Sequence, residues 1–294
     1  MNSKVQIAIL FLWLAGLAAA TEAASSLDQA IAAYEKRDVE NALELLEVLA
    51  KTDEKQALMN LAKVEMRSGK AKNALRAAER LVEVYPDDPD AHLTLGMAYL
   101  TMMGEVNVLR LISMAKQARA GWEKAIALDP NHIGGLYSLF SYYANAPKVG
   151  GGDIEQAHLM QARLAAIDAG YGYLSIALLQ AKDENFDLAE ANLLKAASAL
   201  DTAGVYFTLA QFYLDRERFE DAMDAIAKFP LKPSNFWDPD PPARYLVIAN
   251  AQAGLGNIVA ARAAIDAGLA EKPGKRLHEF FENIRKDLRI HHQQ

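Results

Sequence analysis

The sequence contains no cysteine. This absence excludes disulfides, zinc–thiolate sites, iron–sulfur clusters and a cysteine nucleophile. The chain also has no run of basic residues, and its formal net charge is −7. Because nucleic-acid binding requires lysine and arginine gathered on one face, we expect no nucleic-acid partner.

The common signatures of enzymes and metal proteins are missing as well. The six histidines form neither a His-Glu-x-x-His nor a His-x-His pair, and no Gly-x-Ser-x-Gly occurs. No local pattern selects two of the 38 acidic residues as a glycosidase pair. The glycine run at residues 150–152 is followed by Asp153 rather than by Lys and Ser or Thr, so we interpret it as a turn before a helix that Asp153 caps. We predict a chain that is not an enzyme and has no cofactor and no metal.

The first residues have the composition of a secretory signal. Lys4 precedes an apolar run over residues 5–17, and Ala18, Ala19 and Ala20 fit the small-residue cleavage rule. The run is shorter than the ~20 residues needed to span a bilayer. We expect residues 1–24 to be a signal peptide cleaved near Ala20, and the mature chain to be periplasmic or secreted, without stable membrane insertion. An uncleaved membrane anchor is the alternative.

What the sequence has in abundance is hydrophobic residues, 52% of the chain, and they recur at a fixed period. Ala177 and Ala210 lie 33 residues apart, and so do Ala189 and Ala222. A period close to ~34 residues with small residues at fixed places is typical of stacked helix–turn–helix units. Small residues let the helices approach closely while bulky side chains fill the gaps between them. One unit cannot bury its apolar face alone, so several must stack.

The motifs within this period resemble those of tetratricopeptide repeat proteins of the bacterial exported type. Residues 95–99 (Leu-Gly-Met-Ala-Tyr) match the first helix of the family's two-helix unit, and residues 118–130, which end in Asp-Pro, match the second. The resemblance covers about residues 26–270 and implies an all-α fold, a right-handed α-solenoid of about seven helix pairs. Residues 275–289 alternate apolar and charged residues at helical spacing, which predicts a C-terminal capping helix with a solvated outer face.

The expected organisation is an array over residues 25–270 and a capping segment over 271–294. The units lie near residues 26–55, 56–88, 89–130, 131–169, 170–202, 203–230 and 242–270. A proline-rich linker loop over 231–241 interrupts the array, because proline stops helices, and we expect Phe236 and Trp237 to hold it against the body. The third unit carries an apolar insertion at residues 101–113 that we expect to lengthen its helices.

In the family that the chain resembles, the first helices of successive units line a concave groove. The corresponding positions here are apolar, aromatic or amide: Leu93, Met97, Leu139, Tyr142, Tyr143, Tyr171, Leu174, Leu178, Phe207, Gln211, Leu246 and Asn250. Relatives of the chaperone-docking type hold a peptide's terminal carboxylate with a clamp of Lys, Asn and Arg at such positions, and that clamp is missing here, because the matching residues are apolar, aromatic or amide. An apolar and aromatic groove favours an apolar peptide, a partner helix or a hydrophobic ligand. The alternative for any single residue is a place in the core.

These observations favour a non-catalytic exported scaffold that binds another protein, or a peptide segment, of the cell envelope. A second hypothesis is a periplasmic binding protein for a small hydrophobic or lipid-like ligand that assists a transporter. A third hypothesis is an enzyme, but no set of nucleophile, base and orienting group can be recognised in the sequence.

Overall fold

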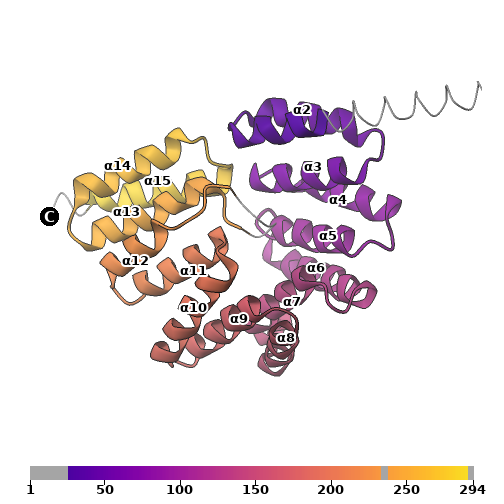
Figure 1. The fold of residues 1–294 in the computed structure, drawn as a ribbon. Coiled ribbons are helices and arrows are strands. Elements are labelled where there is room, and N and C mark those ends of the chain that lie inside the picture. Colours follow the sequence, from indigo (N-terminus) through magenta and orange to yellow (C-terminus); the bar gives the residue numbers. More distant parts are fainter. Residues whose placement is uncertain (1–25, 233–237, 291–294) are drawn as a thin grey trace, which may run out of the picture.

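The structure is a computed structural model that describes residues 26–232 and 238–290. Within these ranges the regular elements are helices, and no strand occurs. The helices follow one another in pairs that stack into a curved array, coloured from indigo to yellow in Figure 1. The expected signal peptide, Phe236 and Trp237 lie outside the described residues.

Over residues 26–232 and 238–290, the array consists of seven helix pairs and one terminal helix. The pairs are residues 26–35 with α2 (Val39–Ala50), α3 (Lys55–Arg67) with α4 (Ala71–Val84), α5 (Pro89–Met102) with α6 (Val108–Leu128), α7 (Ile133–Asn145) with α8 (Ile154–Ile167), α9 (Ala169–Lys182) with α10 (Phe186–Leu200), α11 (Ala203–Leu214) with α12 (Phe219–Ile226), and α13 (Arg244–Gly254) with α14 (Ile258–Ala270). The terminal helix is α15 (Lys275–Ile290), and two short 3-10 turns are η1 (Lys148–Gly150) and η2 (Pro241–Ala243). The predicted fold class is therefore confirmed. None of the helices in the described ranges is both long and apolar enough to cross a membrane.

The small residues of the repeat lie where the helices touch. Ala177, Ala189, Ala210 and Ala222 are all fully buried. Gly96 shows the reason, because a Cβ atom at this position would lie 2.4 Å from Nε1 of Trp122. The α5 backbone thus packs directly on the indole of α6, and any larger residue at Gly96 would force the two helices apart.

The insertion in the third unit lengthens a helix, as its apolar residues predicted. The helix α6 has 21 residues, beginning at Val108 behind an Asn107 cap whose side chain accepts a hydrogen bond from the N–H of Arg110. The glycine run after α7 is a turn, as expected. Gly151 has a φ of +94°, and a Cβ atom on Gly152 would lie 1.7 Å from the carbonyl oxygen of Ala146.

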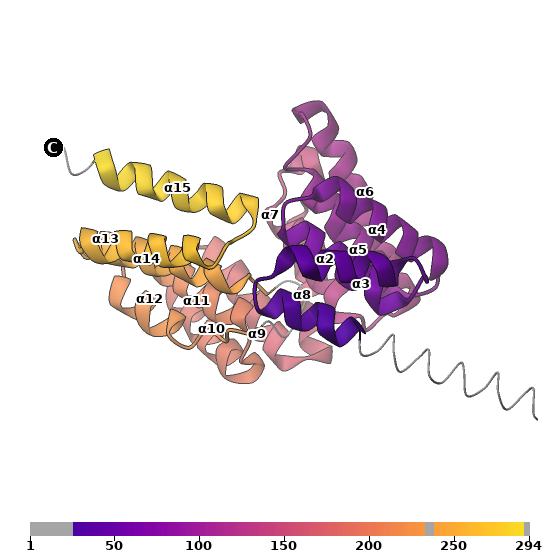
Figure 2. The same ribbon diagram turned by 90° about the horizontal axis from the view of Figure 1, so that it is seen from above.

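The two ends of the array meet. Asp240, just before η2, pairs with Arg37, which follows the first helix. The start of α15 lies against the turn after α3, where a Cβ atom on Gly69 would lie 3.0 Å from Cβ of Lys275. Beyond this contact α15 caps the last pair: Phe281 is fully buried over Gly268, while the neighbouring Phe280 is 47% exposed. Figure 2 shows α15 above α13 and α14. The curved array is therefore closed by contacts between its first and last units.

Candidate functional site

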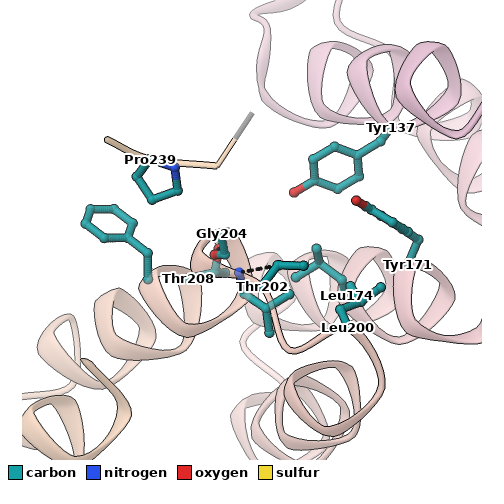
Figure 3. A pocket seen from close by; sticks show the side chains of 10 residues that line it. Tyr137, Tyr171, Leu174, Leu200, Thr202, Gly204, Thr208 and Pro239 are labelled. Atoms are coloured by element: carbon teal, nitrogen blue, oxygen red, sulfur yellow. Dashed lines mark hydrogen bonds between the residues drawn. The ribbon is translucent and has the colours of Figure 1, made fainter. Parts of the chain in front are cut away.

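The first helices of three successive pairs build an apolar cleft on the inner face of the array. Tyr137 of α7, Tyr171 and Leu174 of α9, and Phe207 of α11 line it, and its volume is about 250 Å³. The rings of Tyr137 and Tyr171 meet edge to face, with centroids 5.5 Å apart. Figure 3 shows these two tyrosines at one end of the cleft and Pro239 on the other side. This inner cleft is therefore bordered by aromatic side chains, by the end of α10 and by the start of α11.

Burial affects the protonation of the aromatic wall. Desolvation raises the pKa of Tyr137 to about 12, because the phenolate would be poorly solvated there. An ordinary tyrosine is already neutral at physiological pH, and burial strengthens the preference of Tyr137 for its protonated form.

The polar edge of the inner cleft is the start of α11. Thr202 caps this helix, and its side chain accepts a hydrogen bond from the N–H of Val205 (Figure 3). The next free N–H group, that of Gly204, donates to Oδ1 of Asp238 at 2.8 Å. Asp238 is 3% exposed. The N-terminal end of α11 thus holds a carboxylate, as expected from the unpaired N–H groups and partial positive charge of a helix start.

A second, larger cleft lies between α5, α6, α7 and the turn after α7. Its volume is about 690 Å³, and its lining is nearly all apolar. Met97 and Leu100 of α5 face the lengthened part of α6 with Leu111 and Ile112, and Tyr142 closes the end. The Tyr142 hydroxyl group donates to the carbonyl oxygen of Gly150, which fixes the turn to α7. Tyr137 lines both clefts. We call this second space the insertion cleft.

A third and smaller space, about 170 Å³, contains the polar groups Lys63, Asp90 and His132. Nδ1 of His132 accepts from the N–H of Gly135 at the start of α7, so Nε2 carries the proton and donates to Oδ1 of Asp90 at 3.1 Å. This hydrogen bond is the main reason that the pKa of Asp90 is lowered. Both nitrogens of the imidazole are thus used in joining α7 to α5, and the pair has a structural role.

No group of three or more His, Asp and Glu residues in the described part of the chain is arranged to hold a metal ion. His132, with Asp90, serves as the cap of α7. The clefts offer apolar surface, hydroxyl groups and the start of α11 to an occupant.

The residues expected from the sequence to line a groove divide between the clefts and the core. Tyr171, Leu174 and Phe207 line the inner cleft, Met97 and Tyr142 the insertion cleft, and Leu93 the third space. Leu139 is only 1% exposed and packs in the core, where it can contact no partner. A binding role stays a prediction for all of the other positions, and those that line none of the three clefts are Tyr143, Leu178, Gln211, Leu246 and Asn250.

The structure contains a carboxylate-binding cluster that the sequence did not predict. The groove positions carry no cationic residue, but Arg37, in the turn before α2, and Arg67, at the end of α3, converge on Asp240. Arg37 Nη1 lies 3.0 Å from both carboxylate oxygens of Asp240, Arg67 Nη1 lies 3.8 Å from Oδ1, and the Tyr34 hydroxyl group donates to Oδ1 at 3.3 Å. Arg67 Nη2 also donates to the carbonyl oxygen of Asp238 at 3.1 Å. The repeat period gives no signal for these residues, because they lie outside the repeated positions.

Comparisons with known proteins agree with this architecture. The model of the tetratricopeptide repeat family matches residues 55–98. A tetratricopeptide repeat protein of Parabacteroides merdae is 16% identical, with a TM-score of 0.54 over 90% of this chain and 99% of that one. A chain of the APC/C hetero-tetramer Cut9–Hcn1 is 15% identical, with a TM-score of 0.53 over 90% of this chain and 49% of that one. A chain of the human IFIT1 dimer with PPP-AAAA is 15% identical, with a TM-score of 0.52 over 83% and 54%. No curated protein matches the sequence.

At these identities the structural matches establish the fold and leave the ligand open. The matched segment, residues 55–98, covers α3, α4 and most of α5, which carry the second pair and the start of the third. Together with the stacked pairs of the array, these findings show that the chain has the tetratricopeptide repeat fold, and the family's model matches it over residues 55–98.

Proposed function

We propose that this chain is a non-catalytic scaffold that holds a segment of another protein of the cell envelope on its inner face. Tetratricopeptide repeat proteins generally bind other proteins or peptides. The observation that carries the proposal is the inner cleft, in which Tyr171, Phe207 and the start of α11 surround a residue of irregular backbone, Pro239. The cleft thus already contacts a non-helical residue of the chain, and aromatic side chains with neutral polar tips are typical of binding centres.

The envelope location is part of the proposal and rests on the sequence. Lys4, the apolar run and the three alanines that follow are the features that support export. Mass measurement of the mature chain purified from envelope fractions tests it. A mass that corresponds to a start at Thr21 is expected, and a chain that retains residues 1–20 in the cytoplasm would reject this part.

Capture of a partner with matched variants tests the scaffold role. Phe207→Ala removes a half-buried ring of the inner cleft, whereas Leu194→Ala removes an apolar side chain that is 48% exposed on α10 and lines none of the clefts. We expect the Phe207 variant to lose the protein retained from an envelope extract, and the Leu194 variant to retain it. Equal capture by both folded variants would exclude the inner cleft as the binding site.

The insertion cleft favours a second candidate function, the binding of a small hydrophobic or lipid-like ligand. A volume of about 690 Å³ with an apolar lining lies in the range of small-molecule sites. Ile112 stands at its rim and is 42% exposed, so Ile112→Lys should reduce the retained ligand while the array stays folded. Mass spectrometry of small molecules released from the purified chain, with Leu194→Lys as the control, decides between the candidates. A lipid that is present without a bound protein would favour the second.

A further inference from the structure

Three consecutive residues, Asp238, Pro239 and Asp240, lie on the inner face without belonging to any helix. We call them the closing segment. Each of them makes a separate contact with the array: Asp238 with the start of α11, Pro239 with the inner cleft, and Asp240 with the arginines of the first two pairs. Asp238 is in a bend and Asp240 has extended backbone dihedrals, so consecutive side chains of this non-helical stretch contact different parts of the array, as those of a bound peptide do.

The contacts with the two carboxylates are the kind that recognise a ligand. Arg37 and Asp240 are 19% and 15% exposed, so their attraction is only partly screened by solvent. Tyr34 adds a donor from the first helix, and burial, followed by the charge of Asp240, raises the pKa of its hydroxyl group, which keeps the proton in place. Guanidinium–carboxylate pairs of this kind are among the strongest hydrogen bonds in proteins.

The stacking of the array does not require the closing segment. In a repeat array each unit contacts its neighbours, and the pairs from α3 to α14 are already joined in this way. The contacts of Asp240 reach across 203 residues to Arg37 and 206 to Tyr34, so they are additional to the stack. Contacts that are additional to the stacking of neighbouring pairs, made by a segment whose Pro239 lines the inner cleft, indicate a site that the chain itself occupies.

We propose that the closing segment is an intramolecular ligand of the inner face, and that a partner displaces it with an acidic extended segment of the same pattern. The pattern is two carboxylates on either side of a proline or another compact apolar residue. This inference rests on the proposed function, since it assumes that a protein segment binds there, and it adds the chemistry of that segment and the competition that controls its access.

A peptide with the sequence of residues 231–242, carrying a fluorescent label, tests the competition by fluorescence anisotropy on the full mature chain. The wild-type chain should bind it weakly, because the tethered segment acts at an effective concentration in the millimolar range. Asp240→Asn keeps the shape of the residue while it weakens the closing segment, and this variant should bind the peptide at least tenfold more tightly. Asp238→Ala combined with Asp240→Ala is a second variant with the same expectation.

Two controls make the result specific. Arg67→Gln added to Asp240→Asn should abolish the gain, and a peptide with both aspartates replaced by asparagine should not show it. If the variants retain the helical circular dichroism of the wild type and bind the peptide no more tightly, the closing segment is only a brace and the inference is rejected. If the closing-segment variants show no gain in peptide binding while Phe207→Ala still loses its captured protein, the scaffold role stands without the competition. If the closing-segment variants show no gain and Phe207→Ala also keeps its captured protein, both proposals fail.

Discussion

The middle of the array and its closing contact hold the same molecule together by different physics. From Leu93 to Ala251 one continuous cluster of buried apolar residues runs through α5 to α13. The first two pairs instead have small separate clusters, such as Ala30, Leu43, Leu46 and Val64, and they meet the other end of the chain through Arg37, Arg67 and Asp240. The middle is therefore held by packing that salt leaves untouched, and the closure by charges that salt weakens.

The largest expected effect is on the continuous core. Phe140 is fully buried in α7, so Phe140→Ala should lower the free energy of unfolding by about 3–5 kcal/mol, through lost burial and the cavity left behind. Urea denaturation followed by circular dichroism measures it. Leu46→Ala, in the first cluster, should loosen only the first pairs, which hydrogen exchange resolves. Exchange that increases equally in all helices of the Leu46 variant would contradict the division between the two regions.

The closing contact should give an intermediate effect. Asp240→Asn removes the charge that faces Arg37 and Arg67, and hydrogen bonds to charged groups are worth about 1.5–3 kcal/mol. We expect faster hydrogen exchange in residues 26–35, α2 and α3, with α9 to α12 unchanged. Adding salt to the wild type should reproduce part of the loss, whereas salt should leave the effect of Phe140→Ala unaltered. An exchange pattern that salt does not change would show that charge is not what holds the ends.

A smaller effect, dependent on pH, is expected within the stack. Arg218 donates to Glu190 at 2.6 Å and lowers the pKa of this carboxyl group from its ordinary 4.5. A lowered pKa means that the contribution to stability is present above the ordinary value and is lost as the pH falls below it. Glu190→Gln should thus cost less than about 1 kcal/mol at neutral pH, since Arg218 is 40% exposed, and less still in acid. The melting temperatures of the wild type and the Glu190 variant should be measured across this pH range. A difference between the two that does not change with pH would refute the linkage.

The smallest effect is expected for a charge pair on the outer surface. Arg80 and Asp53 are 44% and 37% exposed, and solvent screens their attraction. Arg80→Gln should leave the melting temperature unchanged at low and high salt. A clear shift would show that exposed charges contribute as much as the partly buried pairs at the closure, which would remove the basis of the comparison.

Local sequence signals predicted most of the fold. The buried positions of Ala177 and Ala210 followed from their spacing, because the need for small residues recurs in every pair. The apolar character of residues 101–113 likewise predicted a longer helix. These features depend on neighbours within one or two units, which the order of residues specifies directly.

The candidate site was only partly predictable. Tyr171 and Phe207 were expected on the inner face, but Leu139 was chosen from α7 where Tyr137, which stands 34 residues before Tyr171, lines the cleft. The repeat period therefore contained a signal that selection by helix face overlooked. The contact between Arg37 and Asp240 has no such signal in the sequence, because it depends on the curvature accumulated over all the pairs between these two residues.

The separation of 203 residues between Arg37 and Asp240 has a consequence for the order of folding. A chain that is synthesised from its amino terminus has made the first two pairs long before Asp240 exists, so these pairs spend that interval without their distant partner. Contacts between residues so far apart in sequence form late, since the intervening chain must first be ordered. The units made first should thus be the last to reach their final stability, and they are the part of a nascent chain that most needs protection.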